Sequence, residues 1–132
     1  MEEKSKEIKL AETAEKLGVD LILLFGSRAD GSNRKDSDFD IAYRSSKVLE
    51  NTDALFNIIE EYFGSDNLQI IDLNIVKPLF LYEIMNNCKV LYAKDMMEFY
   101  DLRCYALGRY YDEVKPLYQI KFDQLKTKYH DS

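Results

Sequence analysis

A seven-residue apolar run that ends at a glycine–serine pair is the feature that most constrains the fold of this chain. Residues 19–25 read VDLILLF, and Gly26 and Ser27 follow directly. A short, nearly continuous apolar run that stops at a turn signal is typical of a strand buried on both faces of a sheet. We therefore predict a covered central strand over 19–25 that ends in a turn at Gly26 and Ser27.

The rest of the chain supplies further strands and the helices that would cover them. Apolar spacing and helix-ending residues predict helices over 3–17 and 51–63, and another from Pro78 to about residue 87. Strand patterns occupy 38–43, 68–76 and 89–92, and from residue 95 onward the spacing is helical, with a kink or break at Pro116. This order predicts an α/β (α+β) fold, a small mixed β-sheet with helices packed on it.

Length and charge limit the organisation and the substrates. A chain of 132 residues has room for one core, so we expect a single domain over 1–132, with a core of about 18–95 and a C-terminal helical segment of about 95–129. Lys and Arg number 18 against 24 Asp and Glu, a net charge of −6. Because no basic excess attracts a phosphate backbone, nucleic acid is an unlikely substrate.

The sequence gives no sign of a membrane, an export signal or a thiol-based site. No apolar run approaches the roughly 20 residues that span a bilayer, and residues 1–10 contain no apolar signal segment. Cys88 and Cys104 have neither metal-ligand nor redox spacing, so they are predicted to be free thiols. We expect a cytoplasmic protein.

The chemistry-bearing residues are Gly26 and Ser27, ten further residues, and then Asp38-Phe39-Asp40. A glycine–serine turn leaving a strand lets backbone amides approach a phosphate closely. Asp38 and Asp40 are two apart, so on a strand both carboxylates emerge on one face, where they can hold Mg²⁺. Taken separately, each motif is also compatible with a plain β-turn or a solvated strand edge.

A further acid interrupts the apolar strand pattern of 68–76. Ile71 and Leu73 share one face of that strand, while Ile70 and Asp72 share the other. As a third carboxylate from a neighbouring strand, Asp72 would complete a site for two metal ions of the kind used in phosphoryl transfer. The alternative is an exposed acid on the open face of the sheet.

The segment GSRADGSNRKDSDFD, residues 26–40, matches the GS, ten residues, DxD pattern of the DNA polymerase beta-like nucleotidyltransferase superfamily. The chain resembles the minimal branch of that superfamily, the MNT-type antitoxins of HEPN/MNT toxin–antitoxin systems. KPLFLYEIMNNCKVLYAKD, residues 77–95, is similar to the final helix and strand of that family. The resemblance covers residues 18–95.

This resemblance implies a polymerase beta-like fold and an antitoxin that transfers AMP from ATP to a tyrosine of a cognate HEPN ribonuclease toxin. ATP would be the nucleotide donor, two Mg²⁺ ions the cofactor, and the toxin the partner in a hetero-oligomer. By position, Gly26 and Ser27 would hold the triphosphate, with a weaker contribution from Arg28. The metal ligands would be Asp38, Asp40 and Asp72, and Asp72 would also help to deprotonate the attacking hydroxyl. Asp30 stands where the family often has arginine, which puts one auxiliary phosphate contact in doubt.

Two other functions stay open: a small-molecule nucleotidyltransferase of the antibiotic-modifying kind, and a non-catalytic antitoxin that acts by binding alone. The C-terminal segment is rich in tyrosine, a pattern compatible either with core packing of a terminal helix or with a docking face for a partner. Its spacing predicts that four residues face inward, namely Phe99, Leu102, Ala106 and Tyr110. Tyr111 and Tyr118 are the better candidates for partner contact.

Overall fold

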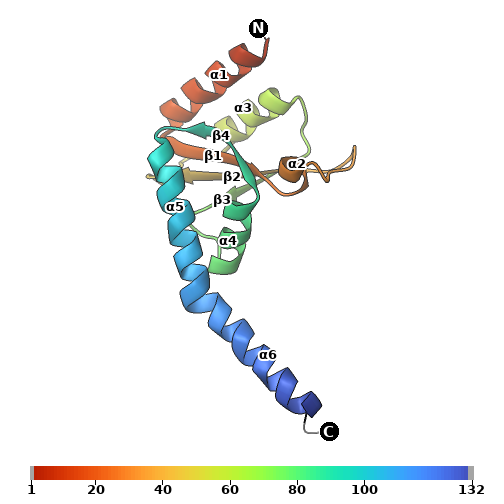
Figure 1. Cartoon of the computed structure of the whole chain (residues 1–132). Helices are drawn as coiled ribbons and strands as arrows, with labels where there is room; N and C mark the ends of the chain where they lie inside the picture. The colour runs from red at the N-terminus through yellow and green to blue at the C-terminus, as the bar shows by residue number, and fades with distance from the viewer. Residues whose placement is uncertain (1, 131–132) are drawn as a thin grey trace.

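The computed structural model describes residues 2–130, apart from the side chains of residues 2, 118, 122 and 126–130 (Figure 1). Tyr118, a candidate for partner contact, therefore lies outside the described side chains. In chain order the elements are α1 (Glu2–Leu17), β1 (Val19–Phe25), α2 (Ser27–Asp30), β2 (Phe39–Ser45), α3 (Asp53–Phe63), β3 (Leu68–Asp72), α4 (Pro78–Asn86), β4 (Cys88–Ala93), α5 (Met96–Arg109), the π-helical turn η1 (Tyr110–Val114) and α6 (Lys115–His130).

β1 is an inner strand of a four-stranded sheet with the order β3-β2-β1-β4. It pairs antiparallel with both β2 and β4, while β2 and β3 run parallel. All seven residues of β1 are buried. This confirms the covered strand predicted from VDLILLF and the mixed sheet predicted from the element order.

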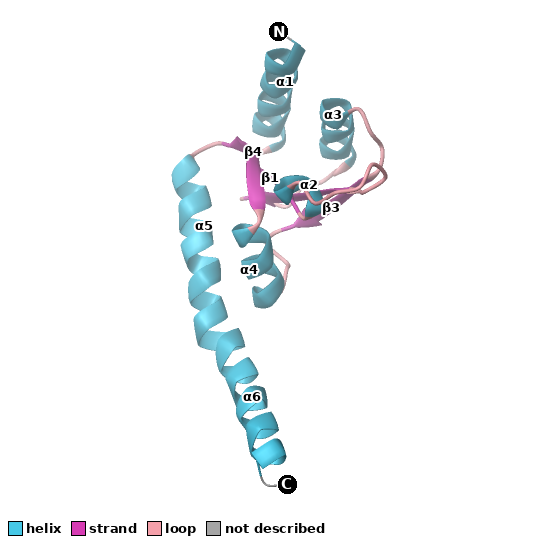
Figure 2. Ribbon diagram, turned by 45° about the vertical axis from the view of Figure 1, so that its right-hand side comes forward, coloured by secondary structure: helices cyan, strands magenta, loops and turns pink. Residues whose placement is uncertain are grey.

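Helices cover both faces of the sheet and form a separate core on each (Figures 1 and 2). On the face of α1 and α3, Ile22 of β1 belongs to a buried cluster with Leu10 and Ile59. On the face of α4 and α5, Leu23 belongs to a second cluster with Ile84 and Leu102. Alternate residues of one apolar strand thus enter opposite cores, as the twofold repeat of a strand requires.

β3 is shorter than the strand predicted over 68–76, because it ends in a turn at Asp72. The Asp72 carboxylate accepts a hydrogen bond from the backbone N–H of Asn74 at 2.9 Å, and the Asp72 carbonyl accepts one from the N–H of Ile75 at 3.2 Å. The Asn74 side chain then donates to the Ser45 carbonyl at the end of β2. A side chain that bonds the backbone two residues on is a common turn device and terminates strand pairing here.

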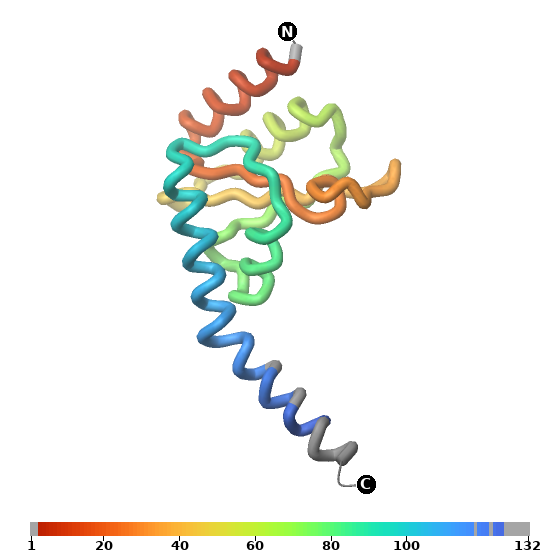
Figure 3. Tube along the Cα trace, in the orientation of Figure 1, coloured from red at the N-terminus to blue at the C-terminus, as the bar shows by residue number. Residues whose placement is uncertain are grey.

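α5, η1 and α6 form one continuous C-terminal arm that leads away from the sheet (Figure 3). Phe99, Leu102 and Ala106 are buried against the sheet side, as predicted, whereas Tyr110 is half-buried and stacks on Tyr82 of α4 at 3.9 Å between ring centroids. The kink or break predicted at Pro116 takes the form of η1, just before the proline, where the arm changes direction (Figure 1). Proline clashes with the carbonyl four residues earlier in an α-helix, and the wider π-helical turn just before it relieves that clash without ending the helix.

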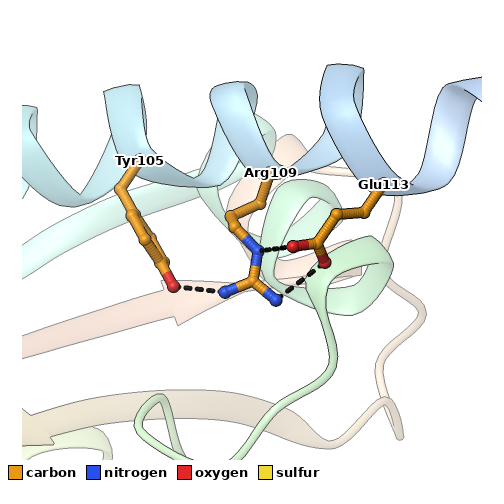
Figure 4. Close-up of polar contacts among 3 residues, drawn as sticks. All are labelled: Tyr105, Arg109 and Glu113. Carbon is orange, nitrogen blue, oxygen red and sulfur yellow. Dashed lines mark hydrogen bonds and ion pairs between the residues drawn. The ribbon is translucent and has the colours of Figure 1, made fainter.

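An ion pair joins α5 to η1, and a hydrogen bond within α5 adjoins it (Figure 4). Two guanidinium nitrogens of Arg109 lie 2.7 Å from the two carboxylate oxygens of Glu113, and a third donates to the hydroxyl of Tyr105. All three side chains lie along one side of the arm (Figure 4). Because they connect successive turns across the change in helix type, they support the continuity of the arm there.

The cysteines and the hydropathy of the helices were also subjects of prediction. Cys88 and Cys104 are free cysteines, as predicted. Among residues 2–130, no helix is both long enough and apolar enough to cross a membrane.

Candidate functional site

The glycine–serine turn and the second carboxylate of the DxD pattern meet at the end of β1. Phe25 pairs with Asp40 across β1 and β2. The next residue, Gly26, has φ +75° and ψ −154°, a backbone conformation that is essentially restricted to glycine. A Cβ atom at Gly26 would lie 2.5 Å from Oδ2 of Asp40. The Gly26 backbone and the Asp40 carboxylate are therefore in direct contact, and only glycine leaves room for it.

Ser27 begins the short helix α2 immediately after this turn. The N–H groups of Ala29 and Asp30 donate to the Gly26 carbonyl at 3.0 and 3.3 Å, which fixes the start of the helix. Ser27 is half-buried. The structure thus places the Ser27 hydroxyl and backbone at the same corner of the sheet as Asp40, within a turn of small residues that a phosphate group could approach.

Neither Asp38 nor Asp40 forms an ion pair with a described residue. Asp38 is exposed just before β2, and Asp40 is half-buried. Burial, and secondarily the charge of Asp38, raise the pKa of the Asp40 carboxyl. Both effects disfavour the ionised pair, and a divalent cation between the carboxylates would relieve them. The donor set therefore fits Mg²⁺.

The Arg28 side chain points toward the loop that carries Asp38 and binds its backbone. Its guanidinium donates to the Ser37 carbonyl at 2.9 and 3.3 Å and to the Lys35 carbonyl at 3.3 Å. It also lies over the ring of Phe39, 4.2 Å from the centroid. Phe39 lies between Asp38 and Asp40 in the sequence. By contacting Phe39 and the Ser37 carbonyl, Arg28 therefore helps to position both acids.

Asn87 is a residue of this site that sequence reasoning missed. Its side-chain amide donates to the Gly26 carbonyl at 3.3 Å and to the Asp30 carboxylate at 3.1 Å. Asp30 also accepts from the N–H and hydroxyl of Ser32, and these bonds lower the pKa of the Asp30 carboxyl. The sequence held no signal for it, because the pairing of Phe25 with Cys88, which brings the residue before Cys88 beside the turn, is set by the register of β1 with β4. Asp30 thus closes the turn after α2, a different task from that of an arginine.

Asp72 is not brought to the Asp38–Asp40 pair, which corrects the expectation of a third carboxylate there. It pairs with Tyr43, whose side chain belongs to the core of α1 and α3. Burial, and secondarily the charge of Asp72, raise the pKa of the Tyr43 hydroxyl. Asp40 instead pairs with Gln69. Three residues of strand, about 10 Å, and a change of face separate Asp72 from the Asp40 position.

In the part of the chain that the structure describes, the acids placed to share a cation at this corner are therefore Asp38 and Asp40. Among the described residues, no group of three or more His, Cys, Asp or Glu side chains is arranged to hold a metal ion. A cation here would draw its charged protein ligands from Asp38 and Asp40, at the start of β2, and its remaining ligands from elsewhere, as Mg²⁺ commonly does when it binds with substrate phosphates.

Comparison with known proteins gives one family and one group of similar structures. The sequence profile of the family described as Polymerase beta, Nucleotidyltransferase matches residues 8–97. That range contains β1 to β4, the Gly26 turn and the acid pair. No curated protein matches the chain.

Several solved structures share the fold over nearly the whole chain. One is a toxin–antitoxin complex with AMP-PNP, with 20% identity, a TM-score of 0.69 and coverage of 91% of this chain and 98% of that one. Another is a tri-AMPylated Shewanella oneidensis HEPN toxin in complex with MNT antitoxin, at 18% identity, TM-score 0.62, and coverage of 94% and 98%. A third, the toxin–antitoxin MntA-HepT, has 19% identity, a TM-score of 0.63 and coverage of 93% and 98%.

Proposed function

Because the chain belongs to the polymerase beta nucleotidyltransferase family, we propose that it transfers AMP from ATP to a tyrosine of a cognate HEPN ribonuclease toxin and thereby acts as the antitoxin. The reaction would be Mg²⁺-dependent and take place in the cytoplasm. Support comes from the solved complexes with the same fold, one with AMP-PNP and one with a tri-AMPylated HEPN toxin.

One observation supports the proposal most: the contact between the Gly26 backbone and the Asp40 carboxylate. Phosphoryl transfer needs a tight, small-residue turn for the phosphates beside acids that hold Mg²⁺. A plain β-turn would not require a glycine against a half-buried acid, and a solvated strand edge would not place two acids beside such a turn. The register of β1 with β2 creates both at one point.

In the proposed reaction the tyrosine oxygen attacks the α-phosphorus of ATP. A phosphorus–oxygen bond forms to the tyrosine, the bond from the α-phosphorus to the bridging oxygen breaks, and pyrophosphate leaves, while the phenolic proton passes to solvent. Gly26 and Ser27 would hold the phosphates, and Asp38 and Asp40 would be the protein ligands of Mg²⁺. When bound, Mg²⁺ neutralises the phosphate charge that would otherwise repel the nucleophile.

The partner would be a protein with complementary charge. The chain has a net charge of −6, and a ribonuclease that binds RNA is expected to carry basic surface. Exposed apolar and aromatic side chains follow the C-terminal arm and suit a protein contact, namely Leu107, Tyr111, Leu117, Ile120 and Leu125. We therefore assign the hetero-oligomer interface to this arm, with Tyr111 at half exposure as one contact.

The test is intact-mass spectrometry of the HEPN protein encoded next to this chain, after incubation with the chain, Mg²⁺ and ATP, GTP, CTP or UTP in turn. We expect mass gains in whole AMP units with ATP, located on tyrosine by peptide fragmentation. An ATP analogue with a methylene bridge between the α- and β-phosphorus should give none. Binding without any mass gain would contradict the proposal in favour of neutralisation by contact. Transfer to small hydroxyl compounds only would indicate an antibiotic-type enzyme.

Arg28→Lys and Arg28→Ala should lower AMP transfer by similar factors, roughly tenfold, because lysine cannot bond two carbonyls and stack on Phe39 at once. The measurement is the initial transfer rate together with hydrogen exchange of residues 31–38, which should rise in both variants. If Arg28 acted mainly as a positive charge at the phosphates, Arg28→Lys would keep most of the rate and leave the exchange unchanged. That result would contradict the anchoring role.

A further inference from the structure

We propose that Gln69 supplies the third side chain of this site, as a neutral amide beside Asp40, and that Asp72 has no part in it. The inference deepens the proposed function, because it rests on Asp38 and Asp40 as the cation ligands. It also changes the charge of the site, which would present two carboxylates rather than three to a nucleotide.

Strand register places Gln69 next to Asp40. The two residues are partners in the parallel pairing of β2 with β3, and neighbouring strands lie about 4.8 Å apart. Paired residues of adjacent strands project their side chains from the same face of the sheet. Gln69 is exposed, so its amide is accessible rather than packed into a core.

The hydrophobic cores show independently which face this is. Ala42 and Ile71 follow Asp40 and Gln69 at a spacing of two within β2 and β3. Ala42 is buried in the core under α4 and α5, and Ile71 packs against the same core. Phe25, the partner of Asp40 on β1, belongs to the same core. Asp40 and Gln69 therefore project from the α4–α5 face, at the edge where the Gly26 turn begins.

The same evidence assigns Asp72 to the other face. Ile70 and Tyr43 share its side of the sheet and pack in the core of α1 and α3. The Asp72 carboxylate already accepts the N–H of Asn74 in the turn that ends β3. Its structural task is to end the strand.

An amide suits this position chemically. Its carbonyl oxygen can complete the ligands of a hard cation, or its NH₂ can donate to a phosphate oxygen, and neither adds negative charge. A nucleoside triphosphate is strongly anionic, so a third carboxylate beside Asp38 and Asp40 would increase the repulsion unless a second cation offset it. Gln69 avoids that repulsion.

The test is Mn²⁺ binding to the full chain without nucleotide, measured by calorimetry for wild type, Gln69→Asp and Asp72→Asn. A carboxylate added about 5 Å from a divalent cation should tighten Mn²⁺ binding about tenfold, even with full aqueous screening. Asp72→Asn removes an acid of the same strand and serves as the matched control. At about 10 Å from the cation its loss should weaken binding by about fourfold at most. If Gln69→Asp leaves Mn²⁺ affinity unchanged, or Asp72→Asn lowers it about tenfold, the proposal is overturned.

A second measurement covers folding and separates this inference from the proposed function. Thermal melting with EDTA and with Mn²⁺ should show that Mn²⁺ raises the melting temperature more for Gln69→Asp than for wild type. If Gln69→Asp does not fold, Gln69→Glu is used in its place. No AMP transfer by wild type together with tighter Mn²⁺ binding by Gln69→Asp would reject the proposed function and retain the place of Gln69. If wild type transfers AMP but neither Gln69 variant changes Mn²⁺ binding, the place of Gln69 is rejected and the proposed function is retained.

Discussion

Asp38→Asn and Asp40→Asn should each reduce AMP transfer by about 10³-fold or more, while the protein stays folded and still binds its partner. Each substitution removes one of the two charged ligands for Mg²⁺, and metal stabilisation of transferring phosphates contributes several kcal/mol to such reactions. Folding should survive, because the Asp40 carboxyl is disfavoured in its ionised form by burial and by Asp38. The rate of AMP incorporation and the melting temperature of each variant check both parts.

Asp36→Asn provides the matched control for these substitutions. Asp36 lies in the same loop and is exposed, and the change in charge is the same. Its backbone carbonyl, which accepts from Asn67, is untouched by the substitution. We expect a near-normal rate. A full loss in Asp36→Asn would attribute the effect to loop charge in general, and retained transfer in Asp40→Asn would contradict the assigned site.

The central strand and its turn were predictable from sequence for a local reason. The run over 19–25 is apolar at all but one position, so neither face could be solvated, and Gly26 ended it. The contact of Gly26 with Asp40 was harder to predict from the sequence. It depends on the register of β1 with β2, which tertiary packing sets. The motif spacing suggested the two parts, and the pairing brings them into contact.

The face of β3 could not be read from its own residues. Ile71 and Leu73 alternate with Ile70 and Asp72, so both faces carry apolar side chains and the pattern does not say which one meets the acid pair. Asp72 was predicted to be the third carboxylate because it is the acid within this strand pattern. The parallel register with β2 decides the matter, and it places Gln69 beside Asp40. A shift of one residue would have exchanged the two faces.

The contacts of Arg28 likewise depend on tertiary structure that the local sequence does not determine. An arginine after a glycine–serine turn is a reasonable phosphate ligand by residue type. Whether its guanidinium is free depends on the path of residues 31–38, which local sequence does not determine. In the structure that path returns the Ser37 carbonyl and the Phe39 ring to Arg28.

Gly26→Ala should lower AMP transfer about 100-fold and the free energy of unfolding by about 1–3 kcal/mol. The conformation at φ +75° and ψ −154° strains any residue with a Cβ atom, which accounts for the loss of stability. The loss of activity has a separate cause. The new methyl group would lie 2.5 Å from Oδ2 of Asp40, so the carboxylate must move away from its place beside the turn. Transfer rates and chemical denaturation measure the two effects.

Gly64→Ala separates strain from site geometry. Gly64 also has a positive φ, +66°, but a Cβ atom there would meet nothing within 4 Å. Its substitution should cost about 1 kcal/mol in stability and leave both transfer and Mn²⁺ affinity unchanged. Gly26→Ala should weaken Mn²⁺ binding as well, because the displaced group is a cation ligand. Equal losses of activity in both variants would mean that transfer follows overall stability, and the contact between Gly26 and Asp40 would then have no special role in the reaction.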